Sequence, residues 1–155
     1  MNELFKAILH KDVSLLNQVL NSGYNVNDQD EDGRTALMEA IIEGDKEIVK
    51  LLLEHGADVN RQDYIAEISA LHFAVQANSY ELVKLLLDNH AEIEIEDVNG
   101  NTPLSDAVFY SKGKGEIIKL LLEHGADKNK QNKHGVSPLS LAESIGNYNV
   151  VKFLE

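Results

Sequence analysis

A repeated string of nine residues dominates this sequence. KLLLEHGAD occurs at Lys50–Asp58 and again, unchanged, at Lys119–Asp127, and a degenerate copy, KLLLDNHAE, lies halfway between them at Lys84–Glu92. Upstream of these strings, leucines recur in the same register: Leu37, Leu71, Leu104 and Leu139. Periods of roughly 20 to 50 residues are typical of supersecondary units that stack in a row. The repeat therefore predicts a solenoid, in which each unit contacts only its neighbours.

We divide residues 1–155, taken as a single domain, into five units. They span about 1–29, 30–62, 63–96, 97–131 and 132–155. Each unit is predicted to contain two short helices. The first helix begins after a hydroxyl side chain suited to cap it: Thr35, Ser69, Thr102 and Ser137. The second ends at a glycine that favours a left-handed backbone, as at Gly56 and Gly125.

Stacking is needed because a single helix pair leaves its apolar face uncovered. The residues expected inside recur with the repeat: Leu37, Ala40, Val49, Leu52, Leu71, Ala74, Val83, Leu86, Leu104, Ala107, Leu120 and Leu121. The fold class predicted from this pattern is an all-α repeat solenoid.

The repeat resembles a known family. The Thr-Ala/Pro-Leu block, the alanine three residues after its leucine, and EIVKLLLEHGADVN at a period near 33 residues are similar to ankyrin repeats over essentially the whole chain. The resemblance implies a helix-turn-helix stack with short β-hairpin connections. It also implies a concave face made of hairpin tips and first helices. Ankyrin arrays typically bind other proteins and rarely carry catalysis.

Several units depart from this pattern. Unit three is one residue longer and has YIAEI (Tyr64–Ile68) where a turn glycine is expected, and His90 replaces the glycine that ends its second helix. We expect either His90 or Asn89 to adopt the left-handed conformation. Unit four has two extra residues between its helices. Unit five stops at Glu155, so either the array ends in a shortened cap or the chain continues.

Charge and composition exclude several classes of protein. The net charge is −12, and residues 1–97 hold 20 of the 26 acidic and 7 of the 14 basic side chains. Such a surface repels phosphate backbones, so nucleic-acid binding is not expected. The absence of cysteine excludes disulfides and thiolate zinc sites. No signal peptide or membrane span is evident, so a cytoplasmic location without membrane contact is predicted. The acidity serves either solubility or attraction to a basic partner.

One acidic stretch matches the spacing of a calcium loop. DQDEDGRTALME (Asp28–Glu39) has oxygen ligands at alternate positions, a glycine at the turn and a closing glutamate. In the repeat, however, Asp30 aligns with Asp63 and Asp97, and the turn glycine also recurs. A calcium loop needs a helix running into its first ligand, whereas the preceding helix ends near Gly23. We therefore interpret the stretch as a solvated acidic hairpin and predict no metal site.

Other catalytic and cofactor motifs are missing from the sequence. His55 and His124 each precede a helix-ending glycine, where the helix dipole favours a cation. No histidine pair has zinc-ligand spacing. SKGKGE (Ser111–Glu116) has the glycines and lysines of a phosphate loop but not their spacing. No catalytic residue, cofactor or enzymatic activity is predicted.

Candidate partner-binding residues come from two neighbouring units and from the acidic hairpins. Phe109 and Tyr110 are expected at the concave end of a first helix, beside the irregular hairpin of unit three with Tyr64, Ile65 and Ile68. Acidic candidates at hairpin tips or on first helices are Glu31, Asp32, Glu43 and Glu67. Exposed aromatic anchors ringed by charge are typical of interface hot spots. The alternative is that Tyr64 and Ile68 pack on Phe109 as local core.

The sequence therefore favours a non-catalytic module, monomeric by itself, that binds another protein, with a basic partner as one option. A second interpretation is a structural or assembly segment of a longer repeat array. A third, by analogy only, is a small inhibitor or immunity-type protein of a toxin or enzyme.

Overall fold

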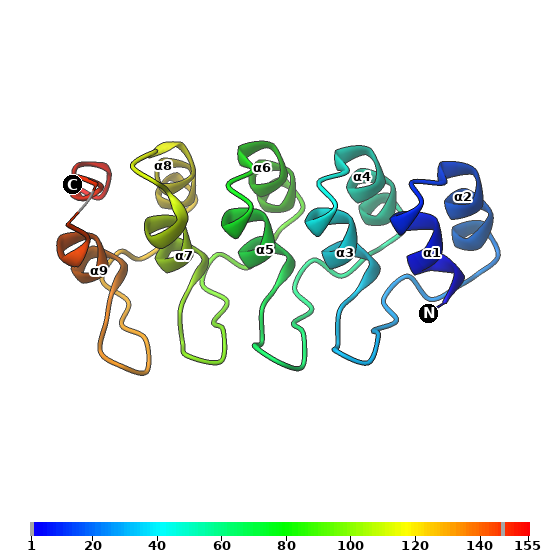
Figure 1. Cartoon of the computed structure of the whole chain (residues 1–155), viewed down its shortest axis with the longest axis horizontal. Helices are drawn as coiled ribbons and strands as arrows, with labels where there is room; N and C mark the ends of the chain where they lie inside the picture. The colour runs from blue at the N-terminus through cyan, green and yellow to red at the C-terminus, as the bar shows by residue number, and fades with distance from the viewer. Residues whose placement is uncertain (1, 147) are drawn as a thin grey trace.

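The computed structural model describes residues 2–146 and 148–155, and in this range nine α-helices lie in pairs along one axis (Figure 1). The pairs are α1 (Glu3–Leu9) with α2 (Val13–Asn21), α3 (Ala36–Ile42) with α4 (Lys46–Glu54), α5 (Ala70–Gln76) with α6 (Tyr80–Asp88), and α7 (Pro103–Tyr110) with α8 (Glu116–Glu123). The last helix, α9 (Pro138–Ser144), packs against a short 3-10 helix, η1 (Val151–Phe153). The predicted all-α stack is confirmed.

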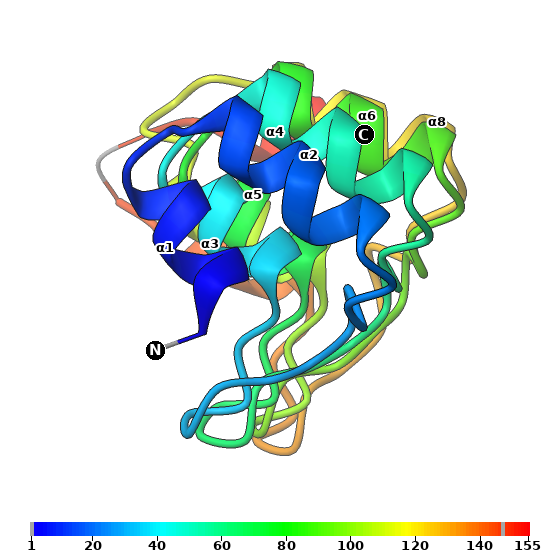
Figure 2. The same ribbon diagram turned by 90° about the vertical axis from the view of Figure 1, so that its right-hand side faces the viewer.

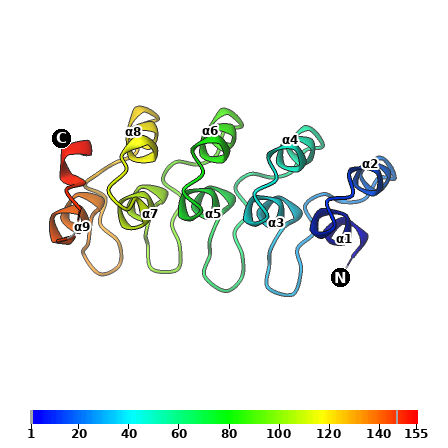
Figure 3. The ribbon, with the colours of Figure 1, turned by 45° about the horizontal axis from the view of Figure 1, so that its top comes forward.

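The first and second helices of the pairs form two separate rows (Figures 1 and 3). Each first helix packs on the next one, in the order α1, α3, α5, α7, α9. The loops between units extend beyond the first-helix row, and they nearly superimpose when the array is viewed along its axis (Figure 2). Their β-pairing within the described residues is limited to single bridges, Gln29 with Thr35 and Gln62 with Ser69. The expected β-hairpins are thus hairpin-shaped loops without regular strands.

Capping explains where the first helices begin. The hydroxyls of Thr35, Ser69 and Ser137 each accept a hydrogen bond from the backbone N–H three residues later. Each cap satisfies one of the backbone donors that a helix start leaves unpaired. Thr102 makes no such bond, and Pro103 follows it at the first position of α7, where its fixed φ and missing N–H suit a helix start.

All twelve residues predicted for the core are buried. Leu37, Leu71 and Leu104 lie between successive helix pairs and are at most 1% exposed. The corresponding Leu139 is only partly buried, because η1 stands where the other units have a full second helix. The array is therefore one continuous apolar core shared between neighbours, as expected of a solenoid.

Of the two residues that the sequence left open, His90 has the left-handed conformation, with φ 65°, and the preceding Asn89 does not. The equivalent glycines, Gly56 and Gly125, have φ 83° and 92°. A residue with a Cβ in this region costs about 1 kcal/mol relative to glycine. The side chain of His90 is exposed, so its removal sacrifices little packing.

We therefore expect His90→Gly to raise the melting temperature by about 2–4 °C, measured by circular dichroism. His55→Gly is the matched control, and we expect it to lower the melting temperature. His55 has a negative φ, and its Nδ1 lies 2.8 Å from the carbonyl oxygen of Leu51. An unchanged or lower melting temperature for His90→Gly would contradict the assignment of strain to this residue.

Candidate functional site

The tips of the inter-unit loops are built on an aspartate or asparagine side chain. Asp30 Oδ1 accepts hydrogen bonds from the backbone N–H groups of Asp32 (3.0 Å) and Arg34 (2.8 Å). Asp97 makes the same pair of bonds in its own loop, at 2.8 Å each. A glycine with positive φ completes the turn, as at Gly33 (φ 80°). The backbone of each loop is therefore stiffened from within.

This use of Asp30 explains the calcium-like spacing. The Asp30 oxygen that a metal would need instead receives two N–H groups of its own loop, and Glu39 lies on α3. Within residues 2–146 and 148–155, no three His, Cys, Asp or Glu side chains are grouped so that they could hold a metal ion. The repeat's own turn accounts for the aspartate and the glycine of the pattern.

The loop of unit three accommodates its extra residue by shifting these hydrogen bonds. Asp63 Oδ1 accepts from the N–H groups of Ala66 (2.9 Å) and Ile68 (3.2 Å), each one residue further along than in the other loops. Glu67 occupies the place of the turn glycine with φ 54°. The tip is consequently longer than its neighbours and carries a carboxylate at its base.

Tyr64 extends from this longer tip toward the preceding loop. Its N–H donates to the carbonyl of Asp32 at 2.9 Å, and its hydroxyl donates to Gln29 Oε1 at 3.2 Å. The ring lies directly over Gly33. The side chains of Tyr64 and Ile65 nevertheless remain 67% and 68% exposed. Tyr64 thus forms an exposed bridge between the loops of units two and three.

Phe109 and Tyr110, at the end of α7, contact each other and not Tyr64. Their ring centroids are 5.0 Å apart with an interplanar angle of 77°, an edge-to-face pair. Phe109 is 63% and Tyr110 39% exposed. The interpretation that Tyr64 and Ile68 bury Phe109 as local core is therefore wrong. The extra residue directs Tyr64 to the opposite side, while Ile68 stays on the side of Phe109.

A groove of about 520 Å³ separates the loops of units three to five from α7 and α9. Its apolar lining is Ile68, Val98, Phe109, Tyr110, Val136 and Leu141. Asp106 is the acidic side chain that α7 adds to this lining. Its Oδ2 accepts a hydrogen bond from Gln76 Nε2 at 2.8 Å. Burial raises the pKa of Asp106 above its usual value, although the bond from Gln76 and the nearby His72 act in the opposite direction.

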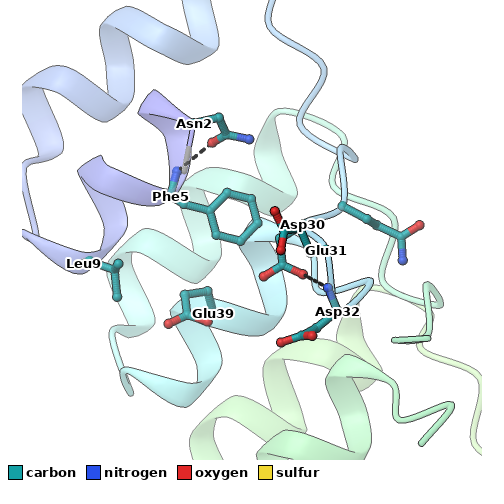
Figure 4. Close-up of a pocket in the computed structure, with 8 residues that line it drawn as sticks. Asn2, Phe5, Leu9, Asp30, Glu31, Asp32 and Glu39 are labelled. Carbon is teal, nitrogen blue, oxygen red and sulfur yellow. Dashed lines mark hydrogen bonds between the residues drawn. The ribbon is translucent and has the colours of Figure 1, made fainter. Parts of the chain in front are cut away.

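A second hollow, of about 460 Å³, lies at the N-terminal end of the array (Figure 4). Phe5 and Leu9 of α1 border it on one side. The acidic residues Asp30, Glu31, Asp32 and Glu39 border it on the other. Burial is the main cause that raises the pKa of Glu39, and the neighbouring carboxylates of Glu43 and Asp30 add to it, whereas Arg34 opposes it.

A comparison with protein-family models decides the classification of this helix-pair stack. The model of ankyrin repeats, in three copies, matches residues 4–97 and 71–155. The chain belongs to the ankyrin repeat family. The resemblance inferred from KLLLEHGAD and its neighbouring blocks is thereby confirmed.

Curated relatives contain similar ankyrin segments within different proteins. A protein of Fowlpox virus named for its ankyrin repeats is 35% identical over 103 residues, which cover 66% of this chain and 17% of that protein. The Notch-regulated ankyrin repeat-containing protein A of Danio rerio is 44% identical over 64 residues, covering 39% and 54% of the two chains. The potassium channel AKT1 of Oryza sativa subsp. indica is 44% identical over 57 residues, covering 37% and 6%. The match thus spans from 6% to about half of the length of these relatives.

The remaining residues that were predicted to bind a partner lie at three places in the array. Glu31 and Asp32 border the N-terminal hollow, Glu43 follows the end of α3, and Glu67 lies in the unit-three loop. Ankyrin repeats generally mediate contacts between proteins. In the described part of the chain, no helix is long and apolar enough to cross a membrane.

Sequence reasoning missed the contribution of Glu39 and Asp106 to the two hollows. Both directly precede the recurring alanine of the first helix, Ala40 or Ala107. Leu141, in the same place in unit five, also lines the groove. The position before the recurring alanine therefore faces the concave side. Its regular place in the repeat could have identified Glu39 and Asp106 as residues of that side.

Proposed function

We propose that this ankyrin array is a non-catalytic module that binds a protein partner on its concave face, the surface formed by the loop tips and the first helices. The observation that carries the proposal is the group of large apolar side chains exposed there: Tyr64, Ile65, Phe109 and Tyr110. Aromatic side chains are unfavourable when left in water and are enriched at interface hot spots. The hydrogen bonds of Tyr64 and the edge-to-face contact between Phe109 and Tyr110 orient these aromatic rings before binding, which lowers the entropic cost of association.

Site-specific photo-crosslinking tests whether this face binds the partner. A photoreactive amino acid is placed at Tyr110 on the concave side, or at Tyr80 on α6 in the second-helix row as a matched control. Both tyrosines are exposed, at 39% and 42%. We expect the Tyr110 position to cross-link one protein partner that the Tyr80 position does not. A partner captured equally or better at Tyr80 would place binding on the other face and contradict the proposal.

The charge distribution supports a partner with a basic surface. The acidic candidates Glu31, Asp32, Glu43 and Glu67 all lie within residues 1–97, which hold 20 of the 26 acidic residues. Opposite charge steers encounter and is screened by salt over roughly 10 Å at 0.1 M.

We therefore expect the association rate with the partner to fall at least about tenfold between roughly 0.01 and 0.5 M NaCl. The dissociation rate should change much less, because steering acts before contact. Stopped-flow mixing measures both rates. An association rate independent of salt would show that the acidity serves solubility alone.

A second candidate function is that of a segment within a larger protein. The observation favouring it is that similar ankyrin segments occupy only 6% of a potassium channel and 17% of a viral protein. Immunoblotting of the native protein tests it, since a mass well above 17.2 kDa supports the segment and a mass near that value contradicts it.

A further inference from the structure

We propose that the groove between units three and five recognises a partner segment in which an arginine or lysine is flanked by apolar residues, with the cation paired to Asp106. This inference rests on the proposed function, because it specifies what the concave face binds. Phe109 and Tyr110 would receive the apolar flank on one side of Asp106, and Ile68 and Val136 would receive it on the other.

The first argument is that Asp106 is the carboxylate available in this groove. Asp97 also lines it, but Asp97 Oδ1 accepts two backbone N–H groups of its loop, and Oδ2 accepts from Asn101 Nδ2 at 3.1 Å. Among the described residues, Asp106 accepts only from Gln76, through Oδ2. One carboxylate oxygen thus keeps its capacity for an incoming donor.

The second argument is the charge of the groove. Its described lining contains Asp97, Asp106 and His134 but neither arginine nor lysine. Two further bases lie beside it: His72 is near Asp106, and Lys133 Nζ donates to the carbonyl of Val98 at 2.8 Å. Burial removes water from the Asp106 carboxylate and thereby disfavours its charged form. A bound cation takes the place of that water, so its pairing with Asp106 is stronger than with an exposed carboxylate. A second copy of this chain, with a net charge of −12, is a poor occupant.

The third argument is the shape of the apolar lining. A volume of about 520 Å³ accommodates a few side chains, and not a folded domain. Phe109 is held by its edge-to-face contact with Tyr110, so the pair forms a preformed apolar surface beside the carboxylate. An arginine or lysine can lay its aliphatic stem on such a surface while its charged end reaches Asp106.

Selection from a phage-displayed library of random peptides tests the proposal. The library is selected against the wild-type chain, and the recovered peptides are then measured against three variants. Asp106→Asn removes the charge but keeps an acceptor for Gln76, Phe109→Ala removes the apolar surface, and Glu123→Gln, exposed on α8, is the matched control for lost charge.

We expect the recovered peptides to share an arginine or lysine beside apolar residues. Their affinity should fall about 10- to 100-fold with Asp106→Asn and should not change with Glu123→Gln. Asp106→Asn should unfold at the same or a higher temperature than the wild type, because it removes a charge that burial penalises. A binding loss without a stability loss separates recognition from a structural role.

Two other outcomes would contradict different parts of the proposal. If peptides depend on Phe109 but bind Asp106→Asn as well as the wild type, or lack a basic residue, the cation pairing is wrong and the concave-face module remains. If no recovered peptide depends on Phe109 or on Asp106, both the cation pairing and the proposed use of this face are wrong.

Discussion

Gly33→Ala is expected to destabilise the array by about 2–5 kcal/mol. Alanine at φ 80° costs about 1–2 kcal/mol from backbone strain alone. A Cβ at this position would also lie 2.4 Å from Cγ and 2.5 Å from the backbone nitrogen of Tyr64. Relieving that overlap adds about 1–3 kcal/mol, because the loops of units two and three must separate and lose their hydrogen bond. Equilibrium unfolding in urea, followed by circular dichroism, measures the change.

Two other turn glycines separate backbone strain from the clash. Gly100 and Gly135 have nearly the same φ, 79° and 74°. A Cβ at Gly100 meets Lys133 at 3.0 Å, whereas a Cβ at Gly135 meets no atom within 4 Å. The cost should therefore decrease in the order Gly33→Ala, Gly100→Ala, Gly135→Ala. Equal effects at all three would show that the contact with Tyr64 contributes nothing.

The sequence was sufficient to predict the stack of helix pairs because each helix carries its own signals. Thr35 and Ser69 cap first helices, the recurring leucines lie between units, and Gly56 ends a second helix, so local and global preferences agree. A left-handed residue at the end of α6 could be predicted for the same reason, because the repeat requires one there, and the structure selects His90 over Asn89.

The direction of Tyr64 could not be predicted, because an inserted residue can be accommodated in more than one register. The structure accommodates it by moving the hydrogen bonds of Asp63 one residue further along, which turns Tyr64 toward Gly33. The position of Asp106 before the recurring alanine indicated the concave side, but its surroundings could not be predicted, for a different reason. Its environment depends on Gln76 of the previous unit, and a contact between residues 30 positions apart is not visible in the pattern of a single helix.

Phe109→Ala is expected to reduce the affinity for the protein partner by about 30-fold or more, which corresponds to about 2 kcal/mol. Phe109 is 63% exposed in the free chain, so binding has much apolar surface left to bury. For the same reason its removal should change the free energy of unfolding by no more than about 0.5 kcal/mol. Isothermal titration calorimetry measures the affinity, and urea unfolding measures the stability.

Tyr80→Ala, on α6, is the control, because it removes an exposed aromatic ring (42%) from the opposite row of helices and should leave the affinity unchanged. Tyr64→Ala tests how far the partner extends along the concave face. Tyr64 contacts the loop of unit two and Phe109 pairs with Tyr110, so their effects on binding should be additive within about 0.5 kcal/mol. If Phe109→Ala lowered stability by several kcal/mol and left the affinity intact, Phe109 would be a core residue and the hot spot would have to lie elsewhere.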